Sequence, residues 1–265
     1  MSDQLQKKPE GFYVEFPEGA AVVIGGSGGI GRAVCVKLAE CGCDVAFTYQ
    51  KNLAAANETA EMIKALGQRA YVQQLDLTDD VATQQFYAEA ASEFSRLHSL
   101  IVATGADIRM SYLAEVEVDE WRQTILNDVV GFFIAVKFII PHLRAGGGGS
   151  IVGLSSAAIV RHAPLDILST GPKGSVESMV RAIAREEGRS NIRANCVALG
   201  VIDIGLMDRV WDQLPPQTAE TWRTGTPLRR IGTAQEAAEA IVFLASSRSS
   251  FTTGQRLVLD GGYSA

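Results

Sequence analysis

The sequence predicts an α/β fold, in which a single parallel sheet carries helices on both faces. Short apolar runs that suit buried strands alternate along the chain with segments whose apolar residues recur at helical spacing. A turn rich in glycine lies between the first such run and the first such helix. No shift in composition separates two domains within the 265 residues. We therefore expect a lead-in over 1–18 and a single domain over 19–265.

Strands and helices alternate in an order that the side chains justify. The first run, 20–24, is wholly apolar, as expected for a strand buried on both faces. Apolar residues from Ile30 to Leu38 recur at helical spacing until Gly42, where the first helix is expected to end. The same two patterns predict a doubly wound sheet of about seven strands. In chain order we expect strand 20–24, helix 30–42, strand 45–49, helix 53–66, strand 70–75, helix 81–94, strand 100–103, helix 121–143, strand 150–154, helix 175–187, strand 193–197, helix 234–245 and strand 256–259.

The glycine-rich turn carries the clearest functional signal. Gly25, Gly29 and Gly31 directly follow the first strand and open the first helix, with the spacing Gly-x-x-x-Gly-x-Gly. Such glycines allow a sharp turn, a close approach of a pyrophosphate to the backbone and tight packing of helix on strand, while the helix N-terminus offers N–H donors. An ordinary tight turn is the alternative. The position after the first strand favours a dinucleotide site in a Rossmann-type fold.

Charge and cysteine content exclude several classes of protein. With 24 Lys and Arg against 30 Asp and Glu, the formal net charge is −6, which argues against nucleic-acid binding and against a polybasic membrane anchor. The four cysteines form no CxxC pair and no zinc-ligand spacing, so we expect no metal site and the reduced thiols of a cytoplasmic protein. The first 19 residues lack the apolar run of a signal peptide, and runs such as 132–136 are too short to span a membrane.

From about residue 20 to residue 262 the chain resembles the short-chain dehydrogenase/reductase family. Besides the glycine spacing, the resemblance rests on Asp76 in LDLTD, Asn127 in the long fourth helix, Ser156 in GLSS, Lys173 and the C-terminal segment 227–262. It implies catalytic roles for Asn127, Ser156 and Lys173. Taken singly, these could be a polar helix residue, a serine that satisfies backbone groups at a strand end, and a surface lysine. The resemblance also implies nicotinamide dinucleotide binding by Gly25, Ser27, Gly29, Ile30, Gly31, Tyr49, Lys51, Asp76, Leu77, Gly105, Lys173, Gly200 and Ile202.

The segment before Lys173 departs from the family pattern. The family places a tyrosine four residues before that lysine, and this chain has Ser169 there. The tyrosine gives a proton to the carbonyl oxygen as hydride arrives, and the lysine lowers the pKa of its phenol. A serine hydroxyl is a much weaker acid on a shorter side chain. Ser169 therefore cannot simply replace the tyrosine, and a helix N-cap with Pro172 in the first turn is favoured for it.

Two other side chains could supply the missing acid. Tyr112 follows the fourth strand, and His162 lies between the candidate serine and lysine; both segments flank the substrate pocket in the family. A packing role for Tyr112 and an exposed loop position for His162 are the alternatives. The chain also departs from the family around this pocket at Ile24, 102–105, Leu199 and Ile204.

Two hypotheses about function follow. The first is an NADP(H)-dependent oxidoreductase that reduces a carbonyl of a small molecule, such as a 3-ketoacyl group or another ketone, or an activated double bond. The second is a nucleotide-binding homologue with impaired catalysis that acts as a partner subunit or a cofactor sensor, which the absent tyrosine favours. The segment 204–227 shapes the substrate pocket in the family, so the sequence does not name the substrate.

The end of the second expected strand predicts NADP(H) as the cofactor in preference to NAD(H). An NAD site places an acidic residue there to bind the ribose 2′-hydroxyl, and this chain has Tyr49. Lys51 stands two residues later, where a cation could meet a 2′-phosphate. A solvated loop lysine is the alternative, and Gly28 lacks the basic side chain that many NADP(H)-binding members carry at that position.

The fourth helix predicts a homo-oligomer. Seven residues make this helix apolar nearly all round, so that it needs a partner beyond its own sheet. The resemblance implies a dimer or tetramer built on this helix and on the last helix and strand. Burial by the chain's own loops is the alternative. The seven are Phe132, Phe133, Ile134, Val136, Phe138, Ile139 and Ile140.

Overall fold

The computed structural model describes residues 16–105, 108–204 and 217–265, so most of the expected lead-in lies outside the described residues. The strands are β1 (Ala20–Ile24), β2 (Asp44–Tyr49), β3 (Ala70–Gln74), β4 (Leu97–Val102), β5 (Gly149–Ser156), β6 (Ile192–Leu199) and β7 (Arg256–Leu259). The helices are α1 (Gly29–Glu40), α2 (Leu53–Ala65), α3 (Asp80–Phe94), α4 (Val118–Ile125), α5 (Gly131–Ala145), α6 (Ile167–Glu187), α8 (Thr218–Gly225) and α9 (Ala234–Ala245).

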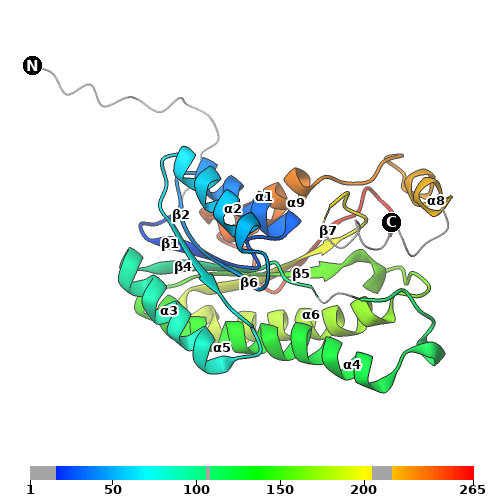
Figure 1. Ribbon diagram of the computed structural model, residues 1–265, viewed down its shortest axis with the longest axis horizontal. Coiled ribbons are helices and arrows are strands. Elements are labelled where there is room, and N and C mark those ends of the chain that lie inside the picture. The colour runs from blue at the N-terminus through cyan, green and yellow to red at the C-terminus, as the bar shows by residue number, and fades with distance from the viewer. Residues whose placement is uncertain (1–15, 106–107, 205–216) are drawn as a thin grey trace, which may run out of the picture.

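The strands form the expected parallel sheet. Its seven strands lie in the order β3-β2-β1-β4-β5-β6-β7, and each neighbouring pair is parallel. Figure 1 shows the sheet between two helical layers, with α1, α2 and α9 on one side and α3, α5 and α6 on the other. The strand order reverses between β1 and β4, which is where doubly wound folds bind ligands beyond the carboxyl ends of their strands.

The sheet separates two hydrophobic cores. One core contains Ile139 of α5 and lies under α3, α5 and α6; the other contains Phe47 of β2 and lies under α1, α2 and α9. Successive side chains of a strand point to opposite faces, so Val22 of β1 enters the first core and Val23 enters the second. This explains why the strand had to be apolar at every position.

The strand β4 begins at Leu97 and not at Leu100 as the sequence predicted. The polar pair His98 and Ser99 concealed its start, although both side chains are buried. The Nδ1 atom of His98 lies 3.0 Å from the hydroxyl of Ser99, and its Nε2 atom lies 3.5 Å from the Cys43 sulfur. Burial lowers the pKa of His98 to about 4, so a neutral imidazole can occupy a core strand.

The helix α6 begins at Ile167, well before Ser175, where the sequence predicted its start. Its N-cap residue is Asp166, so the expectation that Ser169 is the N-cap is wrong, and Pro172 lies inside the helix beyond the first turn. The helix runs through Gly171 and Pro172, and tertiary packing accounts for this. A Cβ atom at Gly171 would lie 2.5 Å from the indole of Trp121 in α4, so the glycine permits close helix contact. The helix α8 was not predicted.

The residues Val118–Ala145 form one long helical rod, in which a π-helical turn, Leu126–Val130, joins α4 to α5. By length and composition this rod could cross a membrane, which the short apolar runs did not reveal. In the structure α5 lies against the sheet and buries Phe132 and Ile139. Of the seven apolar residues expected to make it apolar all round, only Phe133 is exposed. The rest of the chain therefore covers six of these seven side chains wholly or in part and leaves Phe133 exposed.

A buried carboxylate holds α6 against the last strands of the sheet. Glu177 of α6 is 5% exposed, and its Oε1 atom accepts a hydrogen bond from Ser155 of β5 at 2.6 Å. Its Oε2 atom lies 3.0 Å from a guanidinium nitrogen of Arg256 on β7. A buried charge needs such partners, so these contacts fix the position of α6 across the sheet.

Candidate functional site

The glycine-rich turn lies at the carboxyl end of β1. Gly25 has a φ of +85°, a backbone conformation that favours glycine because it has no Cβ atom. The N–H groups of Gly25 and Gly26 donate to the hydroxyl and the carbonyl oxygen of Thr48 on β2 at 3.2 and 2.9 Å. The turn is thereby fixed to the neighbouring strand before the chain enters α1.

The start of α1 packs against this turn without room for a side chain. A Cβ atom at Gly31 would lie 2.1 Å from the carbonyl oxygen of Gly25, whereas one at Gly28 would meet the same oxygen at 3.4 Å. Gly28 is the N-cap residue and offers no side-chain acceptor. The first N–H groups of the helix, including that of Ile30, therefore have no intrahelical partner. Open N–H donors at a positive helix end, beside a bare backbone, fit a pyrophosphate group.

The turn between β2 and α2 carries positive charge. Tyr49 ends β2 where an acidic residue would select NAD, and the exposed Lys51 follows it. A second cation, Arg32 of α1, contacts the N-terminal part of α2, where it donates to the carbonyl oxygen of Ala55 at 3.3 Å and to the carboxylate of Glu58 at 3.0 Å. The sequence reading missed Arg32, because its contact depends on how α1 and α2 lie side by side.

The loop after β3 reaches the same edge of the sheet. Asp76 is exposed, and its Oδ1 atom accepts hydrogen bonds from the N–H and the hydroxyl of Thr78 at 2.9 and 2.8 Å. These bonds lower the pKa of Asp76, so the carboxylate is ionised near neutrality. Leu77 is buried, and its side chain packs 3.2 Å from the place of a Cβ atom at Gly131.

Lys173 of α6 is held by two acceptors. Its ammonium nitrogen lies 3.1 Å from Oδ2 of Asp128 in the π-helical turn and donates to the carbonyl oxygen of Thr104 at 3.2 Å. The side chains of Lys173 and Asp128 are only 14% and 4% exposed. Lys173 is therefore not a surface lysine. An ammonium group carries three N–H donors, so one remains for a further acceptor.

Asn127 lies beside this ion pair in the π-helical turn. Its Oδ1 atom accepts a hydrogen bond from the amide of Gln123 at 3.0 Å. A π-helical turn inserts one residue into a helix and often marks a functional position. Here it sets Asn127 half-buried next to the buried Asp128. The sequence predicted an unbroken helix at this point and did not identify Asp128.

The two serines at the end of β5 point to opposite sides. Ser155 is buried and bonds Glu177, whereas Ser156 lines the cavity described below. The hydroxyl of Ser156 also accepts the N–H of Ala158 at 3.2 Å. Ser156 thus satisfies a backbone group at the strand end and still presents its hydroxyl oxygen to the cavity.

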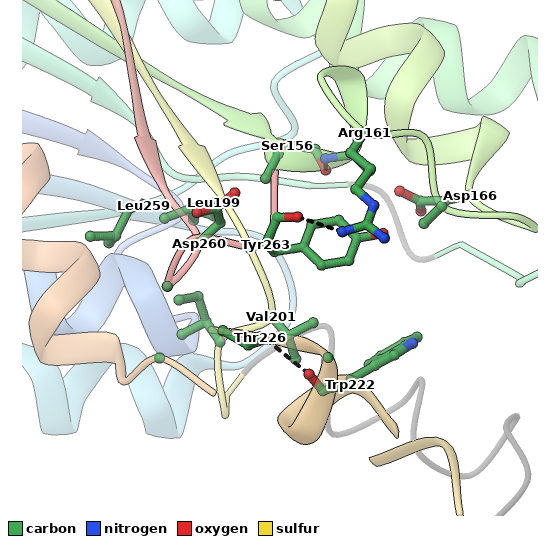
Figure 2. A pocket seen from close by; sticks show the side chains of 18 of the residues that line it. Ser156, Arg161, Asp166, Leu199, Val201, Trp222, Thr226, Leu259, Asp260 and Tyr263 are labelled. Carbon is green, nitrogen blue, oxygen red and sulfur yellow. Dashed lines mark hydrogen bonds between the residues drawn. The ribbon is translucent and has the colours of Figure 1, made fainter. Parts of the chain in front are cut away.

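A cavity of about 460 Å³ opens beyond the carboxyl ends of β5, β6 and β7 (Figure 2). Ser156 and Ser169 line it together with Gly200 and Ile202. Much of the remaining wall is apolar, including Ile108, Met110, Leu199, Val201, Trp222 and Leu228. A mainly apolar cavity with a few polar groups at one end suits a small organic molecule that carries one polar function.

Several ionisable side chains also face this cavity, among them Arg161, Asp166 and Tyr263. Arg161 donates to the carbonyl oxygen of Tyr263 at 2.9 Å, and its guanidinium lies 4.9 Å from the centre of that ring. Asp166 points into the cavity from the start of α6 (Figure 2), and burial raises the pKa of its carboxyl to about 7. Among the described residues, no group of three or more His, Cys, Asp or Glu side chains is placed to bind a metal ion.

The structure does not bring Tyr112 and His162 into the cavity wall. The side chain of Tyr112 is 61% exposed, and His162 is exposed as well. Gly105 follows β4 and is also exposed. Asp166, Arg161 and Tyr263, which do line the cavity, were not selected from the sequence. The row Asp166, Ser169 and Lys173 has helical spacing, which would have identified Asp166 if the start of α6 had been placed correctly.

Comparisons with known proteins agree with this geometry. Residues 25–264 match the family model described as Enoyl-(Acyl carrier protein) reductase. The chain is 33% identical over 250 residues to cis-4-hydroxycyclohexanecarboxylate dehydrogenase of Sinomonas cyclohexanicum, covering 94% of this chain and 98% of that protein. It is 33% identical over 248 residues to L-rhamnose 1-dehydrogenase (NAD(P)(+)) of Sphingomonas sp., covering 92% and 96%. The solved structure of a short-chain type dehydrogenase/reductase from Mycobacterium ulcerans is similar with a TM-score of 0.87 and 26% identity, covering 94% of this chain and 90% of that one.

We predict that Gly31→Ala disrupts the turn and Gly28→Ala does not. The methyl group introduced at position 31 would lie 2.1 Å from the carbonyl oxygen of Gly25. Overpacking of this kind lowers the free energy of unfolding by about 1–3 kcal/mol or more. Gly28→Ala meets only an ordinary contact, so its cost should stay below about 1 kcal/mol. Urea unfolding of both variants measures the difference. Equal free energies of unfolding for the two variants would contradict the tight contact.

Proposed function

This chain belongs to the short-chain dehydrogenase/reductase family, and we propose that it is an NADP(H)-dependent oxidoreductase that reduces a carbonyl or an activated double bond. The observation that carries the proposal is the position of the cavity. Its two serine hydroxyls, Ser156 and Ser169, lie at the same edge of the sheet as the glycine-rich turn and Lys173. A dinucleotide and a small substrate would therefore meet beyond the carboxyl ends of the strands.

The chain's own residues divide into those that would hold the cofactor and those that would hold the substrate. The turn Gly25–Gly31, with Ser27 and Gly29, would bind the pyrophosphate through backbone N–H groups, and Asp76 with Leu77 would border the adenine. The remaining N–H of Lys173 would bind a ribose hydroxyl. Gly105, Gly200 and Ile202 would border the nicotinamide. When bound, the cofactor supplies the hydride.

At the substrate end, each polar side chain has a distinct task. Ser156 accepts a backbone N–H and keeps its own proton, so its hydroxyl would donate a hydrogen bond to the substrate oxygen. Asn127 would hold a water molecule near Lys173. The mainly apolar wall would exclude bulk water and receive the carbon skeleton of a ketone, whether cyclic or a 3-ketoacyl group.

The second candidate function is a nucleotide-binding subunit or cofactor sensor with impaired catalysis. The observation that favours it is Ser169, which lines the cavity from the first turn of α6, where the family motif would place a tyrosine. Against it stand the anchored Lys173 and the cavity itself, because a silent subunit needs neither. The oxidoreductase is therefore the better-supported function.

The cofactor preference and the assembly are parts of the same proposal. Lys51 and Arg32 offer cations to a 2′-phosphate beside Tyr49, which favours NADP(H) over NAD(H). The exposed side chains Leu126, Val130 and Phe133 lie along one face of the long rod, which favours a dimer or tetramer that covers them. The four cysteines are unpaired, which supports a cytoplasmic location.

We expect the purified protein to oxidise NADPH with at least one member of a panel of cyclic ketones, 3-ketoacyl thioesters and enoyl thioesters. Lys173→Ala should lower kcat/KM at least about tenfold, because it removes a hydrogen bond from a charged donor, which contributes roughly 1.5–3 kcal/mol, and also breaks the buried ion pair with Asp128. Lys64→Ala, on the exposed side of α2, is the matched control and should change nothing. NADPH binding without turnover of any compound would instead support the sensor.

We expect tighter binding of NADPH than of NADH, and Lys51→Ala should weaken NADPH binding about tenfold or more. The same change should leave NADH within about twofold, because NADH lacks the 2′-phosphate that the cation meets. Calorimetric titration of both cofactors measures these affinities. Preference for NADH in the unaltered protein would overturn the assignment of NADP(H).

We expect a dimer or tetramer in solution, and Phe133→Glu should weaken the assembly about tenfold or more, because it buries a charge at the interface. Leu53→Glu replaces a residue of similar exposure, 53% against 54%, on α2 at the other face of the sheet. It should leave the assembly intact. Light scattering coupled to size-exclusion chromatography gives the masses, and a monomeric unaltered protein would refute the prediction.

A further inference from the structure

Three polar side chains follow one face of the N-terminal part of α6, and the first of them belongs to its N-cap residue. Asp166, Ser169 and Lys173 are spaced by three and then four residues, so they lie one above another on the helix. Asp166 and Ser169 line the cavity, and Lys173 is anchored beyond them by Asp128. Ser156 lines the same cavity from the end of β5.

We propose that Asp166 is the catalytic residue that exchanges a proton with the substrate oxygen in this chain. The inference rests on the proposed function. Ser169 is one helical turn away, and its hydroxyl is too weak an acid for the task, whereas a carboxyl group in the same cavity can give a proton and take it back. Figure 2 shows the side chain of Asp166 directed toward Arg161 and Tyr263 across the cavity.

The surroundings of Asp166 leave its carboxyl group without an ionic partner among the described residues. Although it is the N-cap residue, its side chain caps no N–H group of α6. The segment 108–112 packs beside it through the backbone bond from Ser111 to Leu165 at 3.0 Å. The cation of that segment, Arg109, is engaged by Glu120 at 3.2 Å.

The other charged groups of the cavity are also engaged. Arg161 is bound to the backbone and ring of Tyr263. Asp260 accepts hydrogen bonds from the backbone and hydroxyl of Ser264. Arg230 and Glu236 pair with each other, and the nearby His162 is exposed outside the wall. Burial therefore dominates, and it raises the pKa of Asp166 to about 7, which is suited to proton exchange near neutrality.

The proposed step balances for reduction of a ketone. With a reduced nicotinamide bound, a hydride, which carries two electrons, would be delivered to the carbonyl carbon. The electron pair of the C=O π bond moves to oxygen and takes the proton of the Asp166 carboxyl group, so that a carboxyl O–H bond breaks and an alcohol O–H bond forms. The Asp166 carboxylate then regains a proton from solvent. Alcohol oxidation runs the same transfers in reverse.

The kinetic test compares Asp166→Asn with the unaltered protein from about pH 5 to pH 9. Ketone reduction needs the protonated carboxyl group, so its rate should fall as the pH rises through about 7, and alcohol oxidation should rise through the same range. Asp166→Asn should lower kcat about 10²–10⁴-fold, and it should remove both the fall in the reduction rate and the rise in the oxidation rate, the two limbs of the pH profile. Because the Asp166 side chain caps no N–H group of α6, the substitution should leave the start of the helix unchanged. Asp80→Asn, exposed at the start of α3, is the control and should keep both limbs.

A second measurement does not depend on activity. A pKa of about 7 in the folded chain lies above the usual value for Asp, so the folded chain binds this proton more tightly than the unfolded chain. The unaltered protein should therefore lose stability relative to Asp166→Asn as the pH rises from about 4 to about 7, with a constant difference above that range. Denaturant unfolding at several pH values measures it.

The outcomes separate this inference from the proposed function. The proposal is supported if the rates of Asp166→Asn no longer change around pH 7, and if the free energy of unfolding of this variant rises relative to that of the unaltered protein between about pH 4 and pH 7. The proposal is overturned if the rates of Asp166→Asn still change around pH 7. It is also overturned if only Tyr263→Phe loses this pH dependence, because the phenol would then be the group that exchanges the proton. If the unaltered protein turns over no substrate, the proposed function fails and this role of Asp166 fails with it.

Discussion

The buried ion pair between Lys173 and Asp128 determines how the candidate site is assembled. It joins α6 to the π-helical turn of the long rod, two segments that meet only through the tertiary structure. A buried charge without its partner is strongly unfavourable, so neither segment can slide without the other. Asn127 adjoins Asp128, and Ser169 lies one turn from Lys173. Their positions therefore follow from the pair, and Thr104 ties it to the end of β4.

Because side chains alternate along β5, its neighbouring residues Ser155 and Ser156 have different roles, one in stability and one in the candidate site. Ser155 turns toward Glu177, which in turn holds Arg256 of β7, so this side of the strand fastens α6 to the sheet. Ser156 turns toward the cavity. The two serines have the same side chain and adjacent positions, and only the direction imposed by the strand separates their roles. A strand that ended two residues earlier, as the sequence suggested, would not have distinguished them.

Local patterns were enough to predict the parallel sheet and the glycine-rich turn. Each of these depends on residues close in sequence, such as a wholly apolar run or a glycine where no Cβ atom fits. The starts of β4 and α6 were predicted wrongly, because burial of His98 and packing of Gly171 on Trp121 override local preference. Asp166 was missed because the start of α6 was missed, whereas the contact of Arg161 with Tyr263 emerges only once distant segments meet.

The helices that carry the two halves of the site, the nucleotide turn and the substrate end, pack on different hydrophobic cores. The glycine-rich turn leads into α1, whose buried side chains belong to one core, whereas α5 and α6 rest on the other. Substitutions in α6 at the substrate end therefore affect a different set of core contacts from those beneath α1. A lineage can exchange one proton donor for another, or lose it, while its nucleotide-binding half persists unchanged. The two halves of such a chain can diverge at different rates.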